Sequence, residues 1–197
     1  MKEGDSLSIP KSFDKRLSYS DYLKLNDDER IEIIDGIPYN MTPAPSTKHQ
    51  QVSMNLSYLL MNFFQEKKCE VFAAPFDVRL FAEGKADKEV FHVVQPDLSV
   101  ICDKRKLDEK GCAGSPDLII EILSPSSAKM DKLTKRNLYE EALVKEYWIV
   151  DPQNELVELY HLGENELYGK PDFFSAEDTM ESILFNGLKL KGKEIFS

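Results

Sequence analysis

The chain lacks any apolar run of about 18 residues or more, which excludes a membrane-spanning helix. Its first residues, MKEGDSLSIPKSFDKRLS, lack the apolar middle of a signal peptide, so we expect a cytoplasmic protein with no membrane contact. Cysteine is scarce too: Cys69, Cys102 and Cys112 are odd in number and match neither a zinc site nor a disulfide framework. Cys102 and Cys112 could approach each other, but we expect all three cysteines to be reduced thiols.

Basic residues are in short supply. The chain has 25 Lys and Arg against 35 Asp and Glu, a net charge of -10. This balance argues against a protein that coats nucleic acid non-specifically, because phosphate binding needs Lys and Arg. It leaves room for a local basic patch, and for a carboxylate site whose charge a metal ion neutralises.

The length of 197 residues and the hydrophobic fraction of 42% suit one globular domain. We expect a flexible N-terminal tail over residues 1–15 and a single domain over residues 16–197. Apolar periodicity and turn residues predict a set of helices and strands. The predicted elements are a short helix after Ser18, a hairpin over 31–41, helices over 47–67 and 129–143, and strands over 71–81, 91–101, 117–123, 146–151 and 156–162, followed by edge strands.

The order of these elements predicts an α/β protein, a mixed sheet with helices on its faces. Residues 117–151 read as strand, helix and strand. The connection between the two strands is long enough for a right-handed crossover between parallel strands.

Two acidic residues stand in strands that should be neighbours. Asp97 lies in QPDLSVI and Glu121 lies in SPDLIIEILSPSS, between two isoleucines. A carboxylate in an apolar layer is costly unless it is paired or holds a metal, and two close carboxylates repel. Mg²⁺ or Mn²⁺ would relieve that repulsion, with the backbone carbonyl of Ile122 as a further ligand. The alternatives are a structural salt bridge for Glu121 and a turn-capping role for Asp97.

Lysines on the following helix could supply a cation to this site. The strand from Glu121 to Ser124 covers roughly 10 Å at about 3.3 Å per residue. The helix from Lys129 to Lys135 returns roughly 9 Å at about 1.5 Å per residue, so Lys135 should lie level with Glu121. The estimate ignores rotation about the helix axis, so Lys132 remains a competitor. A run of lysines on a helix is also typical of a solvated face.

Two further residues are candidates for the same site. Glu32 lies among isoleucines in RIEIIDG, and His49 begins the second predicted helix at the edge of its apolar face. Glu32 could equally be a hairpin residue paired with a nearby base. A hydrogen-bonded structural histidine at a helix start is the favoured interpretation of His49.

Six motifs in this order resemble the Uma family of restriction-endonuclease-like bacterial proteins, within the PD-(D/E)XK nuclease superfamily. The motifs are IEIIDG, PAPSTKHQQV, QPDLSVI, SPDLIIEILSPSS, DKLTKRNLY and VKEYWIVDP. The resemblance covers roughly residues 18–160 and implies a restriction endonuclease-like αβββαβ core and divalent-metal hydrolysis of phosphodiester bonds. It implies Asp97 as the acid of the PD motif, Glu121 as the second acid, and Glu32 as the acid of the first element.

The sequence departs from the superfamily pattern at one position. Leu123 stands two residues after Glu121, where the superfamily usually has lysine. In this family the lysine is expected on the following helix, and Lys135 fits that position.

The main hypothesis is therefore a Mg²⁺- or Mn²⁺-dependent endonuclease that hydrolyses DNA. Its metal ligands would be Asp97, Glu121 and the Ile122 carbonyl, its other catalytic residues Glu32 and Lys135, and its accessory residues His49 and Lys132. The alternative is a non-catalytic module that keeps the nuclease fold and binds nucleic acid or a partner protein. A glycosidase with a carboxylate pair is a third, disfavoured reading. We also expect a homodimer, because nucleases that cut both strands often pair two sites.

Overall fold

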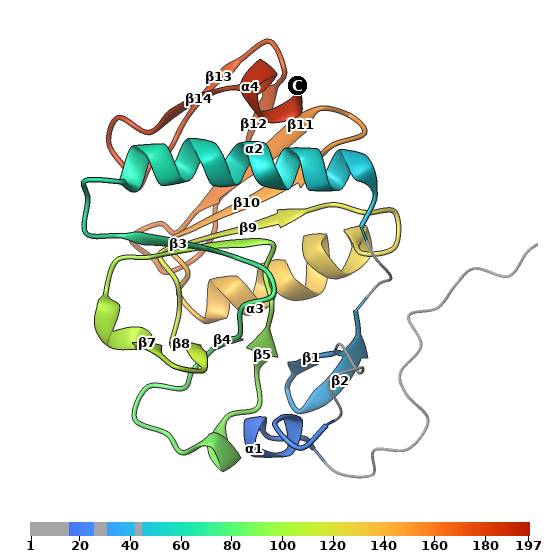
Figure 1. Ribbon diagram of the computed structural model, residues 1–197, viewed down its shortest axis with the longest axis vertical. Coiled ribbons are helices and arrows are strands. Elements are labelled where there is room, and N and C mark those ends of the chain that lie inside the picture. Colours follow the sequence, from blue (N-terminus) through green and yellow to red (C-terminus); the bar gives the residue numbers. More distant parts are fainter. Residues whose placement is uncertain (1–15, 26–30, 42–44) are drawn as a thin grey trace, which may run out of the picture.

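The computed structural model describes residues 16–25, 31–41 and 45–197. The predicted tail, residues 1–15, lies outside the described residues, so the division into a tail and one domain stays a prediction. Within the described residues, the strands form two six-stranded sheets and one two-stranded sheet. A mixed α/β fold is therefore confirmed, but the single mixed sheet that the sequence suggested is divided into two (Figure 1).

The first sheet contains the hairpin and the short strands of the middle of the chain. Its strands are β1 (Ile31–Ile34), β2 (Ile37–Asn40), β4 (Val78–Arg79), β5 (Val93–Val94), β7 (Leu107–Asp108) and β8 (Gly111–Ala113). Their order across the sheet is β2-β1-β5-β4-β8-β7, and β4 pairs with β8 in parallel.

The second sheet carries the longest strands. Its strands are β3 (Glu70–Ala73), β6 (Leu98–Ile101), β9 (Leu118–Ile122), β10 (Glu146–Asp151), β11 (Leu156–His161) and β12 (Asp172–Ser175). Their order is β12-β11-β10-β9-β6-β3, and β9 pairs with β10 in parallel as the crossover predicted. The two-stranded sheet consists of β13 (Thr179–Glu181) and β14 (Lys189–Lys191).

The helices are few and of very different lengths. They are α1 (Tyr19–Tyr22), α2 (Thr47–Phe64), α3 (Arg136–Glu141) and α4 (Gly192–Phe196), the 3-10 turns η1 (Asp87–Glu89) and η2 (Lys104–Lys106), and the π-helical segment η3 (Met130–Lys135). No helix in the described ranges combines the length and the apolar character that crossing a membrane requires.

The N-terminal elements form as their sequences predict. Ser18 caps α1 in a capping box with Asp21. The hairpin of β1 and β2 turns at Asp35 and Gly36, whose φ angles are 53° and 76°. Both turn residues thus adopt the positive φ that a tight two-residue hairpin turn requires.

Two segments that the sequence predicts as single strands are each divided between the two sheets. Residues 71–81 contribute to β3 and then β4, and residues 91–101 contribute to β5 and then β6. The bends contain Pro75, which follows a cis peptide bond, and Pro96. Proline has no N–H for a sheet ladder, so each proline is a natural point for the chain to leave one sheet and enter the other.

Helix α2 lies across one face of the second sheet, and η3 and α3 cover the other face (Figure 1). Ile120 and Ile122 of β9 pack in the same cluster as α2, whereas Ile119 packs in the cluster of Tyr139. Because side chains alternate along a strand, Glu121 faces the same side as Ile119, toward η3 and α3. The register of β9 therefore decides which helix meets Glu121.

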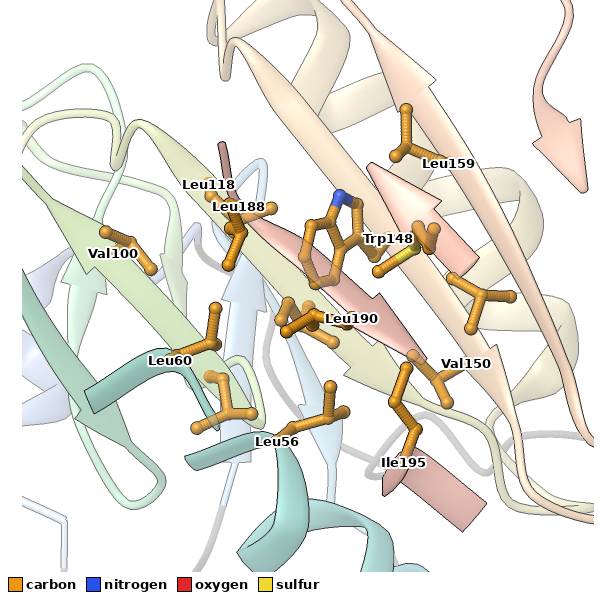
Figure 2. Close-up of a cluster of buried hydrophobic side chains, with 14 of the residues drawn as sticks. Leu56, Leu60, Val100, Leu118, Trp148, Val150, Leu159, Leu188, Leu190 and Ile195 are labelled. Carbon is orange, nitrogen blue, oxygen red and sulfur yellow. The ribbon is translucent and has the colours of Figure 1, made fainter. Parts of the chain in front are cut away.

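The C-terminal segment closes the core beside α2. Trp148 of β10 belongs to the same buried cluster as Leu188, Leu190 and Ile195, and all four side chains are buried (Figure 2). The Asn55 side chain on α2 donates hydrogen bonds to the carbonyls of Ile195 and Ser197, at 3.2 and 2.9 Å. This segment is thus part of the protein's own core.

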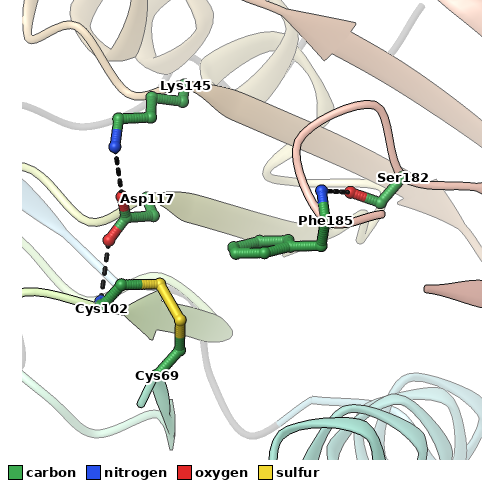
Figure 3. Close-up of a disulfide and its surroundings, with 6 residues drawn as sticks. All are labelled: Cys69, Cys102, Asp117, Lys145, Ser182 and Phe185. Atoms are coloured by element: carbon green, nitrogen blue, oxygen red, sulfur yellow. Dashed lines mark hydrogen bonds and ion pairs between the residues drawn. A yellow bond between two sulfur atoms is a disulfide. The ribbon is translucent and has the colours of Figure 1, made fainter. Parts of the chain in front are cut away.

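The prediction of three reduced thiols is wrong for two of them. Cys69 and Cys102 form a disulfide (Figure 3), while Cys112 is free and buried. Cys69 directly precedes β3 and Cys102 directly follows β6, and these antiparallel neighbours pair Glu70 with Ile101. The sheet register therefore brings two cysteines together that are far apart in sequence. A disulfide is more typical of oxidising compartments, so the cytoplasmic location stays a prediction.

Candidate functional site: an acidic cleft

Five charged side chains from four parts of the chain meet between the two sheets, with Asp131 and Lys135 both on η3. We call this cluster the acidic cleft and define it by Glu32, Asp97, Glu121, Asp131 and Lys135, all of which line one cavity of about 430 Å³. Glu32 comes from β1, Asp97 from the residue before β6, and Glu121 from β9. The cavity is also lined by residues from the start of α2, from the 122–127 loop and from the turn at 152–153.

Lys135 stands at the centre of the cluster. Its Nζ donates hydrogen bonds to Glu32 Oε1 at 2.8 Å and Glu121 Oε1 at 3.0 Å, and lies 3.8 Å from Asp131 Oδ1. The structure thus places Lys135 level with Glu121, in agreement with the estimate from residue rises. Burial alone would lower the pKa of Lys135, but Glu121, Glu32 and Asp131 raise it well above its usual value. The three surrounding carboxylates thus favour the charged ammonium form of Lys135.

Glu121 is buried at the inner side of the cleft. Burial raises its pKa well above the usual value against the opposing charge of Lys135, and Asp131, Asp97 and Glu32 raise it further. Both of its hydrogen bonds within the described chain are made by Oε1, which also accepts from the Tyr139 hydroxyl at 2.7 Å. The second oxygen, Oε2, is the one that remains for another ligand.

Asp97 is held by the backbone of the neighbouring strand. The Ile122 N–H donates to Asp97 Oδ2 at 2.7 Å, and His49 Nε2 lies 3.4 Å from the same oxygen. Burial lowers the pKa of His49, but the hydrogen bond and charge of Asp97 and the carbonyl of Ile122 outweigh burial and raise it. The Nδ1 atom of His49 is buried and has no partner among the described residues. The sequence favoured a fully hydrogen-bonded structural histidine, and one of its two ring nitrogens departs from that expectation.

Glu32 joins the two sheets at the cleft. Its Oε1 accepts from Lys135 and from the Gln95 N–H at 2.9 Å, and Gln95 follows β5, the neighbour of β1. The pairing with a base that the sequence offered for Glu32 is thus confirmed, and its role as a site acid stays a prediction.

Lys132 lies apart from the cluster. Its ammonium pairs with Glu158 of β11, and it does not line the cavity. The π-helical turns of η3 bring Asp131 and Lys135 to the buried side together, while Lys132 stays partly exposed. Short π-helical segments occur frequently at functional sites.

Sequence reasoning missed Asp131 and Tyr139. Asp131 is buried, and burial raises its pKa from 3.8 to about 6, with contributions from Glu32 and Asp97 against Lys135. Its position four residues before Lys135 was the available signal, since such residues share a helix face. Tyr139, four residues after Lys135, extends the same stripe to Glu121.

The donor chemistry of the cleft suits a hard divalent cation. Four carboxylates line the cavity against one buried ammonium, with only Lys48 as a second lysine in the lining. Among the described residues, no three His, Cys, Asp or Glu side chains stand close enough to share a metal ion. Mg²⁺, however, commonly takes one or two carboxylates and completes its shell with water and substrate oxygens. The predicted ligands Asp97, Glu121 and the Ile122 carbonyl fit that coordination preference.

The fold and the cleft define a mixed α/β protein with a buried, lysine-centred acidic site. The chain belongs to the Uma2 family, described as "Putative restriction endonuclease", whose model matches residues 19–191.

The chain is similar to three proteins from two organisms. Two are uncharacterized proteins of Synechocystis sp. (strain ATCC 27184 / PCC 6803 / Kazusa). The first, slr1290, is 28% identical over 153 residues, which is 76% of each chain. The second, sll1609, is 30% identical over 142 residues, covering 70% of this chain and 76% of the relative. A solved structure, described as a putative nuclease belonging to DUF820 from Anabaena variabilis ATCC 29413, is 21% identical. It superposes with a TM-score of 0.69 over 91% of this chain and 97% of that chain, and so supports the fold.

Proposed function

We propose that this chain is a divalent-metal-dependent endonuclease with a restriction endonuclease-like core that hydrolyses phosphodiester bonds in DNA. The observation that carries the proposal is the buried Lys135 ammonium, held by Glu32 and Glu121 in an open cavity with more carboxylates than cations. A purely structural ion pair would need no such cavity and no excess of acids. Family membership supports the same reaction class.

In this proposal each residue has a separate task. Asp97, Glu121 and the Ile122 carbonyl hold Mg²⁺ or Mn²⁺, with Asp97 oriented by the Ile122 N–H. A divalent cation bound there would offset phosphate charge and lower the pKa of a coordinated water. Glu32 fixes the ammonium of Lys135, which stabilises the negative charge that develops on the phosphate during hydrolysis. His49 assists at the edge of the cleft by holding Asp97.

The first test is calorimetric titration of Mn²⁺ into the wild-type protein and into Glu121→Gln. We expect binding in the wild type and its loss in the variant, because the amide replaces a charged oxygen ligand. Glu158→Gln is the matched control, since Glu158 is a nearly buried carboxylate that does not line the cavity. Binding that survives in Glu121→Gln would overturn the assigned metal site.

The second test is cleavage of plasmid DNA and of single-stranded oligonucleotides, with Mg²⁺, Mn²⁺ or a chelator. Metal-dependent cleavage that disappears in Glu121→Gln would support the nuclease. Absence of metal binding and of cleavage in the folded wild type would instead favour a non-catalytic module that uses the cleft to hold nucleic acid or a partner protein.

A further inference from the structure

The outward face of α2 is unusually apolar for a solvent-facing surface. Met54, Tyr58 and Met61 are 67%, 67% and 61% exposed, the highest values among the large hydrophobic side chains of the described residues. Their spacing of four and three residues puts them in one stripe along the helix. The stripe lies opposite the buried face of Val52 and Leu56, which packs on the second sheet.

The same face carries no charge. Residues 49–65 contain no Asp, Glu, Lys or Arg, although these types make up 30% of the chain. A helix face in water normally carries charged residues, whereas the centres of protein interfaces are poor in charge and rich in Met and Tyr. Without Lys or Arg the stripe does not suit nucleic acid. Its composition fits a protein partner.

The stripe is also nearly symmetric about its centre. Gln51, Met54, Tyr58, Met61 and Gln65 lie at alternating intervals of three and four residues. When two such helices pack antiparallel, Tyr58 meets Tyr58 of the second copy, Met54 meets Met61, and Gln51 meets Gln65. A two-fold interface must be self-complementary in this way, whereas a partner of another sequence would not require it.

We propose that α2 is the interface of a homodimer in which the α2 helices of two copies pack antiparallel and cross near Tyr58. Each copy has a net charge of -10, so two copies repel over most of their surfaces. The charge-free stripe is where close approach costs least. This inference stands independently of the proposed nuclease activity.

The arrangement keeps the two acidic clefts apart. His49, which lines the cavity, lies nine residues before Tyr58, about 13 Å along the helix axis at 1.5 Å per residue. In an antiparallel pair the two clefts therefore lie toward opposite ends of the helix pair.

Sedimentation equilibrium of the full chain over a range of concentrations tests the interface. We expect the wild type to approach about 45 kDa, twice the chain mass of 22.6 kDa, and Tyr58→Lys to stay at the monomer mass. Leu133→Lys is the control, because Leu133 is 57% exposed but lies on η3, away from α2. A wild type that is monomeric throughout, or a dimer that persists in Tyr58→Lys, would overturn the proposal.

Cysteine cross-linking tests the register independently. Under mild oxidation Tyr58→Cys should form a covalent dimer, and Met54→Cys alone should form none. A mixture of Met54→Cys and Met61→Cys should form one. The wild type treated in the same way controls for Cys69, Cys102 and Cys112. A covalent dimer of Met54→Cys alone, or none with Tyr58→Cys, would rule out the antiparallel pairing.

Discussion

Two buried glutamates on adjacent parallel strands have opposite surroundings. Glu121 lies in β9 and Glu146 lies in β10, and both are almost completely inaccessible to solvent. Glu146 accepts from the Trp148 indole N–H at 2.7 Å and from the Leu184 N–H at 2.8 Å. Its hydrogen-bond donors are neutral, and together they connect the sheet to the C-terminal segment.

Glu121, by contrast, has Lys135 and three carboxylates as neighbours and faces a cavity. Burial raises the pKa of both glutamates, but only Glu121 is raised further by other carboxylates. Burial of an acid is therefore not by itself a sign of function. A site is indicated when buried acids outnumber the cations and the surplus charge borders a space that a ligand can enter.

Removal of the central cation should have the largest effect. Lys135→Met leaves Glu32, Glu121 and Asp131 without their shared partner, which should cost about 3–5 kcal/mol of unfolding free energy at neutral pH. If the cleft binds metal, added Mn²⁺ should restore part of that stability, since a cation can then occupy the acidic cluster. Urea unfolding with Mn²⁺ and with a chelator measures both effects. Equal stability of variant and wild type in chelator would show that the ion pairs contribute little.

Replacement of Glu146 should lower the stability of the protein without changing its metal affinity. Glu146→Ala leaves the Trp148 and Leu184 N–H groups without their acceptor, at about 1–3 kcal/mol each, so we expect a loss of about 2–6 kcal/mol. Mn²⁺ affinity of the folded variant should match that of the wild type. Urea unfolding measures the expected loss of stability, and calorimetry on the same sample measures the Mn²⁺ affinity. A change in metal affinity would contradict a purely structural role for Glu146.

Asp131 should make stability depend on pH. Its pKa is about 6 in the folded protein against 3.8 ordinarily, so between these values the folded state binds more protons than the unfolded state. Stability due to Asp131 is therefore fully present below about pH 4 and falls as pH rises to about 6. At about 1.36 kcal/mol per pKa unit the fall is about 3 kcal/mol, with Asp131 buried and shielded from solvent.

Asp131→Asn should lack this decline. We expect the unfolding free energy of the variant, relative to that of the wild type, to rise by about 3 kcal/mol between pH 3.5 and 7. Urea unfolding in chelator measures this difference. Parallel curves for the two proteins over that range would show that the pKa of Asp131 is the same in the folded and the unfolded protein.

Much of the fold could be predicted from local patterns, and the errors arose where distant pairing decides. The hairpin at Asp35 and the helix α2 follow from turn chemistry and from apolar periodicity. The division of two strands between sheets was signalled by Pro75 and Pro96 but needs the second sheet to be known. The disulfide of Cys69 depends on the register of β3 against β6, which spacing alone does not reveal.

For the site, the positions of residues along the strand and helix axes could be predicted from the sequence. The direction in which the helix face points could not. The rise per residue places Lys135 level with Glu121, and the four-residue spacing puts Asp131 on the same helix face as Lys135. Only the structure shows that this face is turned toward Glu121. The contribution of Glu32 from the other sheet came from a resemblance and from its apolar neighbours, not from any spacing. Catalytic roles for these residues remain predictions.

The smallest effect is expected for Lys132, which the sequence left as a competitor of Lys135 for the role of the site lysine. Lys132 is 41% exposed and pairs with Glu158 outside the cavity, so Lys132→Met should cost less than about 1 kcal/mol. It should leave Mn²⁺ affinity and any DNA cleavage unchanged, whereas Lys135→Met should abolish cleavage because no other buried ammonium lines the cavity in the described chain. Cleavage assays on both folded variants decide the assignment. If Lys132→Met is inactive and Lys135→Met is active, Lys132 is the catalytic lysine and the ammonium of Lys135 is structural.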